Sequence, residues 1–67
     1  MKDVSGALES LRAERDRLVR ELEELEKKHE KGVIQEEEYA ARKKELERKV
    51  VEVMDRIVQM EFLLGQR

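Results

Sequence analysis

The stretch that decides the fold is Lys31-Gly32-Val33-Ile34-Gln35-Glu36-Glu37-Glu38-Tyr39. Gly32 follows a lysine-rich turn, and a glycine just past a helix end supplies the left-handed residue that closes the helix. The acidic run beginning at Glu36 suits the first turn of a new helix, because the helix dipole favours anions there. The stretch therefore predicts a turn over residues 32–35 between two helices.

The second helix is expected to have Gln35 as its N-cap. Glu38 then falls at the position from which a capping-box side chain reaches back to the N-cap backbone, and Ile34 and Tyr39 fall at the two positions of a hydrophobic staple. Gln is a weak N-cap, so Ser or Thr at this position would stabilise the helix start by roughly 1 kcal/mol more.

The same segment resembles the helical hairpin of the SHOCT (short C-terminal domain) family over residues 25–46. The family pattern is Gly-x-Ile-Thr-x-Glu-Glu-Phe/Tyr-x-x-x-Lys-x-x-Leu, preceded by a leucine, and Gln35 stands here where the family has threonine. The matching residues are Leu25, Gly32, Ile34, Glu37, Glu38, Tyr39, Lys43 and Leu46. Family members carry the hairpin at the end of longer proteins, where it is implicated in oligomerisation. The resemblance implies a helical hairpin and self-association, and it implies no chemistry.

Length and composition predict one small all-α domain covering residues 1–67. Of the 67 residues 48% are charged and none is proline or cysteine, which is typical of long helices and coiled coils. The net charge is −2 with both signs interspersed, so no direct nucleic-acid contact is expected. No apolar run has the length of a membrane span or a signal-peptide core, which favours a cytoplasmic protein without a membrane partner. Abundant Glu, Lys and Arg without Asn or Thr resemble a thermophilic composition.

Apolar residues recur at alternating spacings of three and four in both halves of the chain, which is the heptad pattern of a coiled coil. The first half predicts a helix over about residues 5–31, with Ser5 as N-cap after a frayed start. The second half predicts a helix over about residues 36–64. The first seam consists of Val4, Leu8, Leu11, Leu18, Leu22 and Leu25, and the second of Tyr39, Leu46, Val50, Val53, Ile57, Met60 and Leu64.

The two seams fit one antiparallel register. Leu22 opposite Leu46 and Leu8 opposite Met60 share a single midpoint at Ile34, which lies inside the predicted turn. This agreement predicts a two-helix antiparallel coiled-coil hairpin with arms about 40 Å long. Two flanking ion pairs are expected from the same register, namely Glu14–Arg56 and Glu21–Lys49.

Three polar seam residues are candidates for specificity. Arg15 has two interpretations of equal weight. Either it fixes the register by reaching Glu14, Glu52 or a carboxylate on a partner chain, or its stem covers the seam while the guanidinium reaches solvent. His29 is expected to stack near Tyr39 at the closed end of the hairpin, because a single histidine beside carboxylates supplies too few ligands for a metal site.

A second apolar stripe lies off the seam of the second helix. It consists of Val51, Met54, Val58 and Phe62, with Val19 beside it on the first helix. A thin hairpin buries little surface against its conformational entropy, and an exposed apolar patch usually marks an interface. The stripe therefore predicts dimerisation into a four-helix bundle. The alternative is a small regulator that docks the stripe on a heterologous protein such as an enzyme, ribosome or nucleic-acid machine.

The expected function is that of a self-associating, non-enzymatic interaction or scaffold module. The sequence contains no nucleophile elbow and no Gly-rich phosphate loop, and a thin helical pair offers no concavity that excludes water. No cofactor is expected. A membrane-surface role for residues 50–64 is disfavoured by their intermixed acidic residues.

Overall fold

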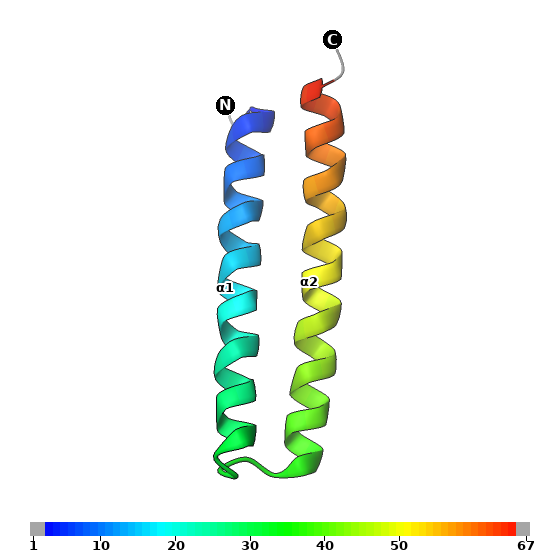
Figure 1. Cartoon of the computed structure of the whole chain (residues 1–67). Coiled ribbons are helices and arrows are strands. Elements are labelled where there is room, and N and C mark those ends of the chain that lie inside the picture. Colours follow the sequence, from blue (N-terminus) through cyan, green and yellow to red (C-terminus); the bar gives the residue numbers. More distant parts are fainter. Residues whose placement is uncertain (1–2, 66–67) are drawn as a thin grey trace.

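The protein is a pair of helices that lie side by side, run in opposite directions and are joined by a short turn (Figure 1). The computed structural model describes residues 3–65. Helix α1 spans Val4–Glu30 and helix α2 spans Glu36–Gly65. The Cα trace measures 50 × 17 × 14 Å. The predicted all-α two-helix hairpin is therefore confirmed.

Helix α1 begins one residue earlier than predicted, and the prediction of Ser5 as its N-cap was wrong. The Asp3 carboxylate accepts a hydrogen bond of 2.8 Å from the Gly6 backbone N–H, and the Asp3 carbonyl accepts one of 3.1 Å from Ala7. Asp caps a helix as well as Ser does, and the earlier start brings Val4 into the helix, where it is half-buried. Of the start predicted to be frayed, residues 1–2 lie outside the described part of the chain.

Gly32 closes helix α1 as the sequence predicts. Its φ angle is 71°, in the left-handed region that favours glycine. The Gly32 N–H donates to the carbonyl of His29 and the Val33 N–H donates to that of Lys28, both at 3.1 Å. These two bonds form a Schellman motif. A β-carbon at Gly32 would meet nothing within 4 Å, so the backbone conformation and not the space requires glycine.

The start of helix α2 follows the prediction in its backbone but not in its side chains. The Tyr39 N–H donates to the Gln35 carbonyl at 2.8 Å, which places Gln35 directly before the first turn. Within residues 3–65 neither Gln35 nor Glu38 makes a side-chain hydrogen bond, so the predicted capping box is not formed. The weak capping ability of Gln accounts for this. The predicted staple residues, Ile34 and Tyr39, are partly buried against the core.

The core is one seam between the two helices. Its buried side chains are Leu8, Leu18, Leu25, Leu46, Val53 and Ile57, and those packed partly buried against them are Leu11, Leu22, Ile34, Tyr39, Val50, Met60 and Leu64. The buried residues all occupy heptad positions assigned to the seam, because a 3.5-residue repeat keeps one line of side chains facing the partner helix.

Candidate functional site

The candidate site is the apolar stripe of helix α2, formed by Val51, Met54, Val58 and Phe62. Their exposed fractions are 61%, 41%, 60% and 64%. At about 100° of rotation per residue, the stripe points about 120° away from the seam direction of the same helix. Helix α1 packs on the seam, so it leaves the stripe in contact with water.

Helix α1 contributes Val19, which is 39% exposed, to the edge of this stripe. Arg12 of α1 and Glu61 of α2 form an ion pair of 3.0 Å across the hairpin. One heptad farther along α1 and one heptad back along α2, the same positions hold Val19 and Met54. These two residues therefore lie at the same level on the same side of the hairpin, and the apolar surface extends from α2 onto α1.

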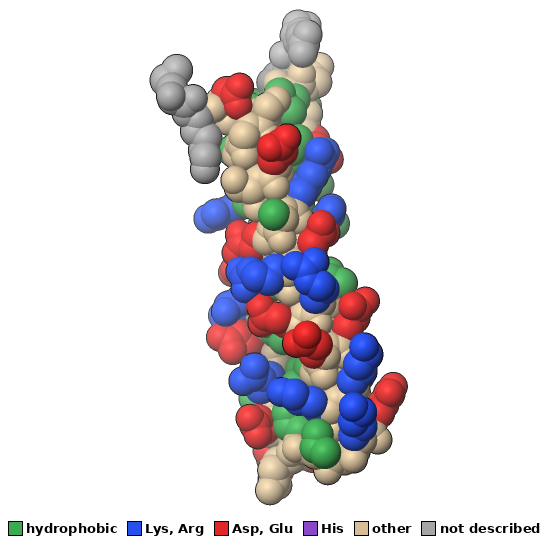
Figure 2. Space-filling model, turned by 90° about the vertical axis from the view of Figure 1, so that its left-hand side faces the viewer, with side chains coloured by type: hydrophobic (Ala, Val, Ile, Leu, Met, Phe, Trp, Pro, Cys, Tyr) green, Lys and Arg blue, Asp and Glu red, His purple; other side chains and the backbone are tan. Residues whose placement is uncertain are grey.

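Charged residues surround the stripe and cover the remaining faces. The Arg12–Glu61 ion pair lies on the α1 side of the stripe, and the exposed residues Lys44 and Arg48 precede it on α2. The face that α1 presents carries interleaved acidic and basic side chains with small apolar areas between them (Figure 2). Mixed charge of this kind is typical of a solvated surface, which sets the stripe apart from its surroundings.

Sequence reasoning missed two exposed apolar residues. Leu63, half exposed, lines a shallow apolar hollow together with Val58, Gln59 and Phe62 near the end of α2. The sequence signal for Leu63 was its position directly between the stripe residue Phe62 and the seam residue Leu64. Val33 is 68% exposed and lies alone in the turn, where a single apolar residue needs no functional explanation.

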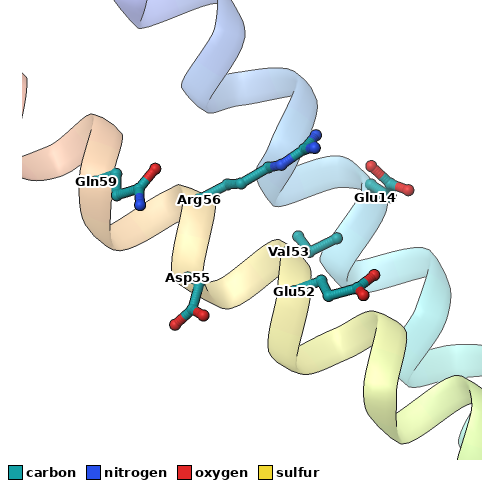
Figure 3. A pocket seen from close by; sticks show the side chains of 6 residues that line it. All are labelled: Glu14, Glu52, Val53, Asp55, Arg56 and Gln59. Carbon is teal, nitrogen blue, oxygen red and sulfur yellow. The ribbon is translucent and has the colours of Figure 1, made fainter.

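A polar hollow lies between the two helices, beside residues 52–59 of α2 (Figure 3). It is lined by Glu14 from α1 and by Glu52, Val53, Asp55, Arg56 and Gln59 from α2. Glu14 and Arg56 flank the same hollow, but the ion pair predicted between them is not formed within residues 3–65. Glu14 instead lies 3.8 Å from Arg17 on its own helix.

The prediction of a second interhelical ion pair, Glu21–Lys49, was also wrong. Glu21 accepts from Arg17 at 2.8 Å, and Lys49 lies 3.8 Å from Glu45. Both contacts join residues four apart on one helix. Such neighbours are already within reach, whereas an exposed pair between helices gains well under about 1 kcal/mol over water. The flanking charges therefore do not fix the register in the way the sequence suggested.

Two of the three polar seam residues, His29 and Tyr39, meet at the closed end of the hairpin. The rings of His29 and Tyr39 stack with centroids 3.8 Å apart and planes 5° apart, as the register predicts. His29 Nε2 lies 2.7 Å from Glu36, and the Tyr39 hydroxyl donates to Glu26 at 2.8 Å. Lys43 Nζ lies 3.6 Å from the same Glu26 carboxylate and 5.6 Å from the Tyr39 ring centroid. These contacts join the end of α1 to the start of α2.

Two pKa values at the closed end are raised. The hydrogen bond to Glu26 raises the pKa of the Tyr39 phenol, because only the neutral phenol can donate it; burial adds to this and Lys43 opposes it. The pKa of the Lys43 ammonium is raised by the neighbouring Tyr39 hydroxyl and then by the Glu26 charge. Both groups stabilise the fold in their protonated forms, fully below their usual pKa values and decreasingly as the pH rises above them.

Arg15 is partly buried on the seam, with 33% of its side chain exposed. Its Nε donates to Asp16 Oδ1 at 3.1 Å. In the part of the chain that the structure describes, it pairs with neither Glu14 nor Glu52. Among the described residues of one chain the guanidinium therefore pairs only along its own helix, and a contact with a carboxylate of a partner chain stays a prediction.

Comparison with known protein families, curated proteins and solved structures finds no match for this chain. Within residues 3–65 no helix has the length and apolar character needed to cross a membrane. The same residues contain no group of three or more His, Cys, Asp or Glu side chains arranged to hold a metal ion. The function is argued from the exposed apolar stripe.

Proposed function

We propose that this chain is a non-enzymatic, self-associating interaction module whose apolar stripe joins two copies into a four-helix bundle. The observation that carries the proposal is one continuous line of large apolar side chains outside the seam, each at least 41% exposed on α2. Removing such a surface from water is favourable, and exposed apolar patches of this kind mark interaction sites.

A second copy is the proposed occupant because the isolated hairpin is thin. The buried core of the described residues consists of six side chains along one line. A chain of this size seldom offsets its conformational entropy with so small a core. A symmetric dimer gives the bundle a second apolar contact without a second gene product. The resemblance of residues 25–46 to the SHOCT hairpin supports the same proposal.

The outer faces, which carry mixed charges, stay exposed in the proposed dimer and are available to further protein partners. The dimer therefore acts as a scaffold. The proposal involves no cofactor and no direct contact with nucleic acid or membrane. A cytoplasmic location remains a prediction from the sequence.

Sedimentation equilibrium over a wide concentration range, with circular dichroism on the same samples, tests the proposal. The expected result is a highly helical dimer whose helicity falls when dilution dissociates it. A monomer at every concentration would contradict self-association. The stripe would then be assigned to a different protein, which is the heterologous docking alternative.

A further inference from the structure

We infer that the two copies meet through their α2 helices and that these helices run antiparallel, with the two-fold axis near Arg56 and Ile57. This inference rests on the proposed self-association and adds the partner surface and its direction. The apolar stripe lies on α2 with only its edge on α1 among the described residues, so α2 supplies most of the contact on each copy. The α1 helices then flank the central α2 pair.

The extent of the stripe along α2 fixes where an antiparallel pair is centred. The stripe covers residues 51–62, in the half of α2 nearest the open end of the hairpin (Figure 1). An antiparallel pair centred on the stripe sets Val51 level with Phe62 of the second copy and brings the two Val58 side chains together near the axis. Val51 and Phe62 then meet at both ends of the overlap and the two Val58 side chains meet near its centre, while Asp55 of each copy lies level with Val58 of the other.

Charge complementarity favours the antiparallel arrangement. In this arrangement Arg48 lies level with Gly65 of the second copy, where α2 ends. The last turn of α2 carries no basic residue, and the free carbonyl groups of a helix end attract cations. Each Arg48 therefore places a positive charge beside the end of the other copy's α2.

The parallel arrangement places like charges together. Lys44, Val51 and Val58 are spaced seven residues apart, so they follow one line along α2. In a parallel pair Lys44 would face Lys44 of the second copy on that line, whereas in the antiparallel pair it lies beyond the contact. The antiparallel pair brings the two Asp55 carboxylates near the axis, so each arrangement contains one pair of like charges, and the placement of Arg48 beside the helix end decides between them.

Spin labels test the direction, because the chain has no native cysteine and each label reports one site. The full chain is labelled at Ala41→Cys, near the closed end, or at Gln59→Cys, near the axis. At 1.5 Å of rise per residue, the antiparallel dimer places the two Ala41 labels about 45–50 Å apart and the two Gln59 labels within about 20 Å. A parallel dimer places both pairs within about 20 Å.

Sedimentation of the labelled samples distinguishes a failure of the antiparallel contact from a failure of self-association. A dimer with distant Ala41 labels and close Gln59 labels supports the antiparallel contact. A dimer with close Ala41 labels overturns it and leaves the proposed self-association intact, whereas a monomer overturns both. As a second readout, Lys44→Ala should leave the dimer dissociation constant within about twofold of the wild-type value, because Lys44 lies outside the contact. A marked tightening would mean that the two Lys44 residues meet, and would refute the antiparallel arrangement.

Discussion

Replacing Met54 and Val58 together by glutamate should abolish self-association while leaving the helical content largely intact at high protein concentration. Both residues lie outside the seam, and 41% and 60% of their surfaces are exposed in the hairpin. Full burial of a Val or Met side chain is worth about 1.5–3 kcal/mol. Roughly half of that remains available at a dimer contact, or about 1 kcal/mol for each side chain.

Each dimer contains both residues twice, so the double change removes about 4 kcal/mol of association free energy. This corresponds to a dissociation constant raised about a thousandfold. The carboxylates introduced into the contact add to the loss, because a buried charge without a partner is costly. Sedimentation equilibrium measures the change in mass, and circular dichroism on the same samples measures the helical content.

The matched control is Ser10→Glu with Ala13→Glu. These residues are exposed on α1, away from the stripe, and the substitutions add the same number of negative charges. The control should associate as the wild type does. If the stripe variant sediments and melts like the wild type, the stripe is not the interface. If the control dissociates equally, added charge and not loss of the stripe explains the effect.

Four further predictions concern the turn and the seam. Gln35→Thr should improve the α2 N-cap by about 1 kcal/mol and raise the melting temperature by about 4–8 °C; an unchanged melt would mean that α2 is not capped at this position. Gly32→Ala should cost about 1–2 kcal/mol, because its positive φ disfavours a side chain although space is free, and a thermal melt equal to the wild type's would refute the requirement for glycine. Glu26→Gln should return the raised pKa of Tyr39 toward its usual value, which the ultraviolet absorbance of the one tyrosine reports directly; no shift would show that Glu26 does not hold the phenol in solution. Arg15→Leu should raise the melting temperature, since an apolar side chain packs on the seam without the desolvation cost of a charge, and a lower value would show that Arg15 makes a stabilising contact across the dimer.

The hairpin could be predicted from the sequence because its signals are local or periodic. Gly32 takes the positive φ that a helix end requires, and the acidic residues after Gln35 begin the next helix. The heptad spacing identified the line of buried residues from Leu8 to Ile57. The same arithmetic separated the stripe from the seam, since rotation along a helix is set by backbone geometry and not by the partner.

Side-chain pairing could not be predicted in the same way. Glu14 and Glu21 were expected to meet cations on α2, but both lie near Arg17 of their own helix. Long charged side chains have several partners within reach at nearly equal free energy. Rotamers and small differences in distance between the helices select among them, and neither is visible in a spacing pattern.

The sequence by itself determined the two helices, the turn that joins them, the line of residues buried between them and the apolar line left outside. These properties follow from backbone geometry and from the period of apolar residues. Only the tertiary structure decided that Glu26 binds both Tyr39 and Lys43 and that Arg12 pairs with Glu61 across the hairpin. Glu26 and Arg12 lie far from these partners in the chain, so the contacts form only when packing sets the rotation of each helix about its own axis.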